Sequence, residues 1–204
     1  MSRRPTIAVL DYGMGNLRSV ANAIEHVGGR PLLLSGPDAA DAGDAVVVPG
    51  VGAFGACMRG LVERGLDATV GTYLRGTRPV LGVCLGMQVL FASSDEDPGP
   101  GLEYFSGRVR KLPPTVKVPH MGWNEVRWTG NHDLIEGIPS GTRFYFVHSY
   151  APDLDPRSTV GETEYGTVFA AAVAKGPVFA TQFHPERSGD AGLEIYRNLV
   201  RAAA

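Results

Sequence analysis

A cysteine between two glycines is the strongest chemical signal in this sequence. Residues 82–86 read GVCLG, and Cys84 directly follows the apolar run 79–83, so it lies where a predicted strand turns into a helix. This is the thiol form of a nucleophile elbow, and the flanking glycines are expected to permit the sharp turn that lifts the side chain above the sheet. Free cysteines are more often small buried apolar residues. The position of Cys84 favours a nucleophile instead, with its thiolate stabilised by amides at the start of the next helix.

A histidine and a glutamate two residues apart could supply the base that such a nucleophile needs. Residues 179–186 read FATQFHPE, and alternation along a strand would point His184 and Glu186 the same way. An imidazole whose second nitrogen meets a carboxylate is a general base held in one tautomer. A His-x-Glu pair alone is more often a surface ion pair. Together with Cys84 it predicts a Cys-His-Glu triad.

A third strand end carries the sequence PGVG at residues 49–52. Gly50, Gly52 and Gly55 match the spacing of a dinucleotide-binding loop, but the segment follows the second or third strand of the chain and Pro49 interrupts the turn. We therefore reject a nucleotide site here. Backbone amides of this segment could instead stabilise an oxyanion beside Cys84. The alternative is a tight loop without a chemical role.

The elements that must position these residues alternate along the first half of the chain. Apolar runs predict strands at 6–10, 31–34, 45–48 and 79–83, and helical spacing predicts helices at 17–27, 54–64, 66–75 and 85–91. Strands separated by helices form right-handed parallel crossovers with both faces of the sheet covered. Ligands of such sheets bind at the carboxyl ends of the strands, which is where the three motifs fall.

The second half of the chain has a different pattern. Short aromatic and β-branched segments predict hairpins within 109–150 and between 167–174 and 177–183, and residues 191–203 form a last amphipathic helix. We expect a single domain over residues 1–204. Its fold class is α/β, with three layers, a mostly parallel central sheet, helices on both faces and an antiparallel β extension.

Composition sets the general class of the protein. The chain has 204 residues, of which 44% are hydrophobic and 20% charged, which is ordinary globular usage and excludes disorder and coiled coil. The net charge of -2 gives no basic surplus, so no nucleic-acid partner is expected. The apolar runs fall far short of the ~20 residues that span a bilayer. Cys57 and Cys84 match neither a disulfide framework nor a zinc site, and we expect a reduced cytoplasmic protein without a metal.

GVCLGMQ at 82–88 and FHPE at 183–186 together resemble the motifs of the class I, triad-type glutamine amidotransferases. Further segments resemble the HisH family of that class, the glutaminase subunits of imidazole glycerol phosphate synthase. They are DYGMGNLRSV at 11–20, PGVGAF at 49–54, PHMGWN at 119–124 and HSY at 148–150. The resemblance runs from about residue 7 to the end. Met87 stands where other members commonly have His, which favours HisH over the anthranilate and carbamoyl phosphate systems.

The resemblance implies a role for each residue of the site. Cys84 attacks the side-chain amide carbon of glutamine, His184 accepts the thiol proton and then protonates the departing ammonia, and Glu186 orients His184. Water then hydrolyses the γ-glutamyl thioester to glutamate, and no metal or organic cofactor is implied. The backbone amides of Leu85 and of Val51 or Gly52 would form the oxyanion hole. The substrate would be positioned by Gln88, Gly52, Ser149 and Tyr150.

The resemblance also implies a heterodimer with a cyclase subunit, HisF. That subunit uses the ammonia to make imidazole glycerol phosphate and an aminoimidazole carboxamide ribotide in histidine biosynthesis. Free ammonia is protonated and lost in water at neutral pH, so a covered interface is expected. Met121 and Trp123 are typical interface anchors, although core packing in a hairpin explains them equally well. The expected partner-facing residues are Asn16, Arg18, Pro119, His120, Met121, Trp123 and Asn124.

Three other interpretations use the same residues. A different class I amidotransferase would share the triad and differ in the synthase that it serves. A binding or regulatory module on an inactive amidotransferase fold would not need three competent triad residues. A cysteine peptidase or a DJ-1-like protein would fit the elbow, but it would not explain residues 184–186 near the end of the chain together with residues 49–52.

Overall fold

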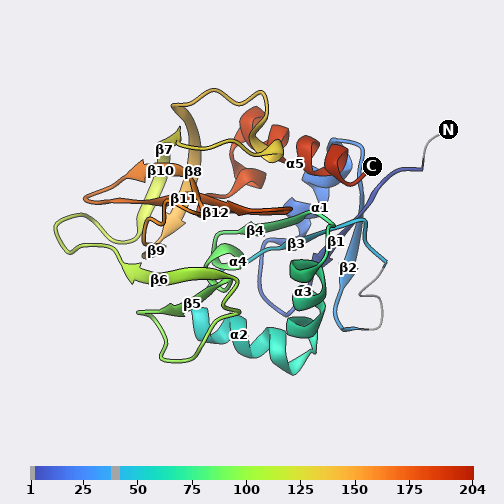
Figure 1. The fold of residues 1–204 in the computed structure, drawn as a ribbon, viewed down its shortest axis with the longest axis horizontal. Coiled ribbons are helices and arrows are strands. Elements are labelled where there is room, and N and C mark those ends of the chain that lie inside the picture. The colour runs from blue at the N-terminus through green and yellow to red at the C-terminus, as the bar shows by residue number, and fades with distance from the viewer. Residues whose placement is uncertain (1–2, 38–41) are drawn as a thin grey trace.

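A computed structural model describes residues 3–37 and 42–204 of the chain (Figure 1). Within this part, a nine-stranded sheet crosses the molecule. Its first five strands pair in parallel and its last four are antiparallel. In spatial order they are β2 (Arg30–Leu34), β1 (Thr6–Leu10), β3 (Ala45–Val48), β4 (Val80–Val83), β12 (Val178–Thr181), β11 (Val168–Lys175), β10 (Thr159–Glu164), β7 (His120–Trp128) and β8 (Thr142–His148).

Helices cover both faces of this sheet. Helices α1 (Leu17–His26) and α5 (Gly189–Ala202) lie on one face, and α2 (Phe54–Glu63) and α3 (Leu66–Arg75) lie on the other (Figure 1). Alternate residues of each strand therefore enter two separate cores: Ile7 and Val9 pack towards α1 and α5, whereas Ala8 and Leu10 pack towards α2 and α3. Strands buried on both faces read as continuous apolar runs, as the sequence does. The expected three-layer α/β fold is confirmed.

A small second sheet of β5 (Phe91–Ser94), β6 (Phe105–Lys111) and β9 (Tyr150–Pro152) lies beside the parallel strands, and it limits the helix after Cys84. The predicted helix at 85–91 is wrong in its second half, because α4 (Leu85–Gln88) ends after one turn. The amides of Leu102 and Tyr104 donate to the carbonyls of Val89 and Leu90, so long-range pairing replaces the helical bonds there.

The other predicted elements are all present, with ends that differ by a few residues. The largest differences are at β12, which ends at Thr181 rather than at residue 183, and at α5, which begins two residues earlier than predicted. Strands β7 and β8 form the expected hairpin, with His120 directly opposite His148. Two 3-10 turns, η2 (Asp133–Ile135) and η3 (Pro185–Arg187), were not predicted. No helix in the described part of the chain is long and apolar enough to cross a membrane.

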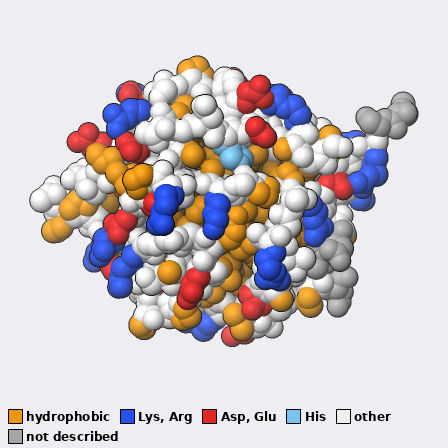
Figure 2. Space-filling view, viewed as in Figure 1, with side chains coloured by type: hydrophobic (Ala, Val, Ile, Leu, Met, Phe, Trp, Pro, Cys, Tyr) orange, Lys and Arg blue, Asp and Glu red, His pale blue; other side chains and the backbone are white. Residues whose placement is uncertain are grey.

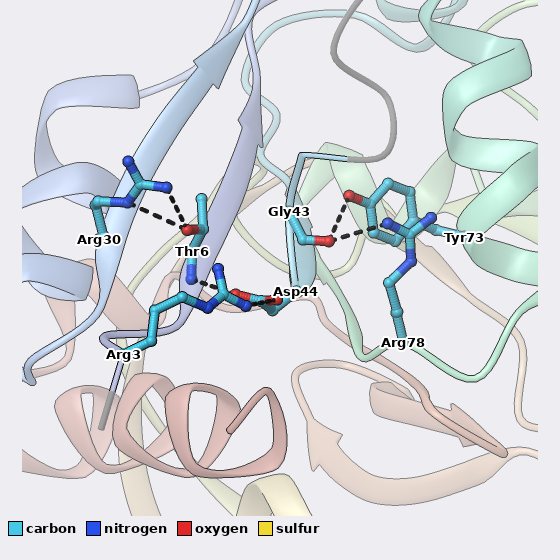
Figure 3. Close-up of polar contacts among 7 residues, drawn as sticks. All are labelled: Arg3, Thr6, Arg30, Gly43, Asp44, Tyr73 and Arg78. Carbon is cyan, nitrogen blue, oxygen red and sulfur yellow. Dashed lines mark hydrogen bonds and ion pairs between the residues drawn. The ribbon is translucent and has the colours of Figure 1, made fainter. Parts of the chain in front are cut away.

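Polar contacts fasten the start of β3 to its neighbours (Figure 3). The amide of Thr6 in β1 donates to Asp44 Oδ2 at 2.7 Å. From the other side, the Tyr73 hydroxyl of α3 and the Arg78 guanidinium donate to the carbonyl oxygen of Gly43, at 3.1 and 3.0 Å. The strand that leads to residues 49–52 is thereby fixed at its beginning.

Candidate active site

Cys84 joins β4 to α4 in a strained conformation, with φ 53° and ψ -107°. Holding a non-glycine residue in this conformation costs about 1–3 kcal/mol. The Cys84 amide donates a hydrogen bond of 2.7 Å to the Thr181 carbonyl, which helps to hold the turn. The flanking glycines permit this turn, as the sequence predicts, although neither has a positive φ. A Cβ on Gly82 would lie 2.9 Å from the carbonyl oxygen of Gly86, and a Cβ on Gly86 would lie 1.8 Å from that of Val48.

His184 and Glu186 form a buried pair beside this turn. His184 Nδ1 donates to Glu186 Oε1 at 2.9 Å, and the two side chains are 3% and 1% exposed. The prediction that strand alternation aligns these two side chains is wrong, because β12 ends at Thr181 and His184 precedes the 3-10 turn η3. That turn brings the carboxylate back to the ring. Among the described residues His184 Nε2 has no hydrogen-bond partner, so this nitrogen is available for proton transfer.

The charges around His184 favour its protonated form. Burial by itself lowers the pKa of this imidazole, but Cys84 and Glu186 together raise it to about 10. An imidazolium next to a cysteine favours the thiolate, the nucleophilic form of the side chain.

Gln182, which was not among the predicted site residues, also contacts Cys84. Its side chain is fully buried, and its Nε2 lies 3.6 Å from Cys84 Sγ, towards which it donates. The available signal was its position two residues before His184.

A pocket of about 370 Å³ opens at Cys84 and His184. It lies where the carboxyl ends of β3 and β4 meet the turn between β8 and β9. The structure thus brings together the residues predicted for the oxyanion hole and for substrate binding, while Glu186 lies behind His184. The pocket is lined by Val51, Gly52, Cys84, Leu85, Gln88, Glu96, Pro119, Val147, His148, Ser149, Tyr150 and His184.

Residues 49–52 run against the start of α4. A Cβ on Gly50 would lie 2.6 Å from the amide nitrogen of Gly86, and Gly52 has φ 102°, which glycine adopts readily. The buried Tyr12 hydroxyl donates to the Pro49 carbonyl and fixes that peptide. Two stretches of backbone that carry amides therefore meet beside Cys84, as an oxyanion hole requires.

Two further pocket residues, Gln88 and Glu96, already make hydrogen bonds within the chain. Gln88 Nε2 donates to the Tyr150 carbonyl at 2.9 Å and to Gln182 Oε1 at 3.0 Å, which leaves its own carbonyl oxygen for a ligand. Glu96 accepts the amide of Phe54 at the start of α2, at 2.8 Å. Glu96 was not among the predicted site residues, because only the long-range fold brings its loop to the pocket.

The predicted partner-facing residues divide into exposed and buried ones. Met121 and Trp123 are 63% and 55% exposed, so core packing, the alternative explanation for them, is wrong. Arg18 and Pro119 are exposed, and Asn16 and Asn124 are half-buried. His120 is only 3% exposed, so the prediction that it faces a partner is wrong. Alternation along β7 turns His120 inwards, opposite His148, whereas Met121 and Trp123 point outwards. In residues 3–37 and 42–204 no cluster of His, Cys, Asp or Glu could hold a metal ion.

Comparison with solved structures identifies the class of the fold. The chain superposes on PurLQS from Thermotoga maritima with a TM-score of 0.79, covering 98% of this chain and 99% of that one. The TM-score is 0.74 for a putative GMP synthase subunit from Thermoplasma acidophilum, with 100% and 96% covered. Both are 19% identical in sequence, so they show the fold alone. The family model "Glutamine amidotransferase class-I" matches residues 8–203, and fold and sequence together define a protein of that class.

Relatives of higher identity narrow the class further. The imidazole glycerol phosphate synthase subunit HisH of Methanothermobacter thermautotrophicus is 47% identical over 195 residues, covering 95% of this chain and 97% of that one. HisH of Aromatoleum aromaticum is 48% identical over 207 residues, with the same coverage. Within the class I glutamine amidotransferases, the chain belongs to the HisH family, which confirms the resemblance of its motifs.

Proposed function

We propose that this chain is the glutaminase subunit of an imidazole glycerol phosphate synthase. It hydrolyses glutamine and passes the ammonia to a cyclase subunit, HisF, for imidazole glycerol phosphate and ribotide synthesis in histidine biosynthesis. The observation that carries the proposal is the buried His184–Glu186 pair beside the strained Cys84, in a chain of the HisH family. The single amidotransferase domain over residues 1–204 and the cytoplasmic location stay predictions.

The site would perform the reaction in two halves. Cys84 Sγ bonds to the side-chain amide carbon, the carbon–nitrogen bond breaks, and His184 Nε2 gives its proton to the nitrogen, which leaves as ammonia. His184 then takes a proton from water, whose oxygen attacks the thioester carbon; the carbon–sulfur bond breaks and glutamate leaves. The backbone amides of Leu85 and of Val51 or Gly52 would stabilise the oxyanion in both halves.

We assign the α-ammonium group of glutamine to Glu96. It is the one carboxylate among the described residues that line the pocket, and the Gln88 carbonyl oxygen supplies a second acceptor. Glu96→Gln is expected to raise KM for glutamine about 10- to 100-fold with a smaller change in kcat, because a hydrogen bond to a charged group contributes ~1.5–3 kcal/mol. Glutamine at this position still accepts the Phe54 amide, so the start of α2 is preserved.

Steady-state kinetics with Asp97→Asn as the matched control check this assignment. Asp97 lies next to Glu96 in the same loop but does not line the pocket. Equal KM values for Glu96→Gln and Asp97→Asn would show that the ammonium group binds elsewhere.

We place the cyclase on the outer face of β7. Trp123 and Met121 project from it, and Trp123 packs edge-on against Tyr145, with ring centroids 6.2 Å apart. The Arg187 guanidinium lies 4.2 Å from the Tyr145 ring centroid and adds a positive charge to this surface. Asn16, Arg18 and Pro119 complete the proposed surface, whereas Asn124 lies on the same face of β7 as the buried His120. Figure 2 shows that hydrophobic side chains also gather across the middle of one face, with charges of both signs around them.

Trp123→Ala is expected to weaken binding of the cyclase subunit about 30-fold or more, because buried aromatic anchors contribute ~2 kcal/mol or more to an interface. Calorimetric titration of the purified subunits measures this Kd. Val62→Ala, which removes another exposed apolar side chain on α2, is the control and should leave Kd unchanged. A similar loss in both variants would argue against β7 as the docking face.

The proposed function is tested by glutamate release from glutamine. The chain is assayed alone, then with the cyclase subunit, then with the cyclase and its ribonucleotide substrate. Activity that rises sharply in the last mixture supports the assignment. Activity that neither addition changes keeps the glutaminase chemistry and indicates another synthase, and no activity in any mixture indicates the inactive module.

A further inference from the structure

A row of hydrogen bonds runs from the surface of the β7–β8 hairpin to the pocket. Asn124 Nδ2 lies 3.4 Å from His120 Nε2, His120 Nδ1 lies 3.0 Å from His148 Nε2, and His148 Nδ1 lies 2.9 Å from the carbonyl oxygen of Tyr150. His120 and His148 are 3% and 6% exposed. The proposed mechanism uses neither imidazole.

The partners at both ends determine where every proton lies. The Tyr150 carbonyl can only accept, so His148 must carry its proton on Nδ1. Its Nε2 is then an acceptor, which requires His120 to donate from Nδ1. His120 Nε2 in turn accepts from Asn124, whose Nδ2 is confirmed as the donor because it also donates to the Glu164 carbonyl at 3.0 Å. All three bonds therefore point in one direction, towards the pocket.

The surroundings keep both rings uncharged. Tyr165 stacks on His120 with centroids 4.0 Å apart, and Phe169 packs against His148 at 5.1 Å. Burial lowers the pKa of His120 to about 4 and that of His148 to about 3. A proton added to Nε2 of either ring would also remove an acceptor from the row.

The Tyr150 carbonyl, where the row ends, receives a second bond from a pocket residue. Gln88 Nε2 donates to the same oxygen at 2.9 Å, so both lone pairs of the carbonyl are used. Tyr150 and the preceding Ser149 line the pocket. Without the hydrogen bond from His148, Gln88 alone would hold this carbonyl. The Gln88 side chain and residues 149–150 would then be less firmly oriented.

We propose that His120 and His148 are positioning residues for glutamine binding: a neutral pair, protonated on Nδ1 in both rings, that holds the Tyr150 carbonyl from beneath the β7–β8 hairpin. Their role in glutamine binding rests on the proposed function. The proton arrangement rests on the hydrogen bonds alone.

Two substitutions of His148 separate its two nitrogens. In His148→Asn, the amide occupies the position of Nδ1 and can still donate to the Tyr150 carbonyl. In His148→Gln, the amide reaches the position of Nε2, which keeps a bond to His120 but loses the donor to Tyr150. We expect His148→Gln to raise KM for glutamine about 10-fold with kcat changed by less than about threefold, because the Tyr150 carbonyl loses one of its two hydrogen bonds. His148→Asn should restore most of the affinity.

Equal KM values in the two variants, whether raised or unchanged, would overturn the positioning role, because a role in packing alone does not distinguish the two nitrogens. The wild-type chain with its cyclase subunit is assayed in parallel. Failure of the wild type to hydrolyse glutamine contradicts the proposed function itself, whereas a hydrolysing wild type with indifferent variants contradicts only this inference.

Nitrogen-15 NMR of the wild-type imidazoles tests the arrangement without activity or substitution. Two-bond correlations between the ring nitrogens and carbon-bound protons should show both rings protonated at Nδ1 and bare at Nε2 between pH 6 and 8. A proton on Nε2 of either ring in that range would overturn the proposal, even if His148→Gln failed to fold.

Discussion

Cys84→Ala is expected to abolish glutamine hydrolysis while the chain still folds and binds its cyclase subunit. The variant lacks the sulfur atom that would form the thioester, so only uncatalysed attack by water on the bound amide is left. Removing the nucleophile of comparable hydrolases lowers kcat by about 10⁴- to 10⁶-fold. Alanine keeps a Cβ at φ 53°, so the strained backbone is little changed and the fold is preserved.

Cys57→Ala is the matched control, because the chain has two cysteines. Cys57 is fully buried in α2, and burial raises the pKa of its thiol to about 12, so it is a poor nucleophile. Glutamate release should persist in Cys57→Ala and be lost in Cys84→Ala. A glutamine analogue with an electrophilic side chain should label the wild type once, at Cys84, as seen by mass spectrometry. Residual turnover in Cys84→Ala, or a label on Cys57, would exclude the assigned nucleophile.

The sequence predicts the positions of the candidate catalytic residues better than it predicts the reasons for their geometry. Strand ends could be located because continuous apolar runs, such as residues 45–48 and 79–83, mark strands buried on both faces. Cys84 lies at such an end, directly after β4, whereas His184 lies three residues beyond the end of β12. The contact of His184 with Glu186, however, depends on a 3-10 turn, and the sharp turn at the elbow depends on the backbone of Cys84 itself.

Residues that act through long-range contacts were the ones that sequence reasoning missed. Glu96 enters the pocket from a loop after β5, and Gln182 reaches Cys84 across the junction of β4 and β12. Local periodicity carries no information on either contact. The same limit explains α4, whose predicted second half pairs with residues 102–105 instead of continuing as a helix. The burial of His120 followed from strand alternation, once its strand and register were known.

His184→Ala is expected to cost nearly as much activity as loss of the nucleophile, about 10⁴-fold or more in kcat, because the same imidazole transfers a proton in both halves of the reaction. Glu186→Gln should be less severe, at about 10²- to 10⁴-fold. Its amide can still contact the ring, but it removes the negative charge that stabilises the imidazolium and no longer enforces the Nδ1–H tautomer. Single-turnover glutamate release measures both variants, with thermal unfolding to confirm that each is folded.

The titration of His184 tests the physical reason given for the effect of Glu186→Gln on activity. Because Glu186 helps to raise the pKa of His184 to about 10, Glu186→Gln should move this pKa downwards. Nitrogen-15 NMR of the ring follows the shift directly. If the pKa fell but kcat did not, the carboxylate would tune the imidazole without limiting the chemistry. If neither changed, Glu186 would have no part in the triad. A lower kcat together with a lower pKa is the result expected of a carboxylate that keeps the imidazole oriented and charged, so that it can protonate the departing ammonia.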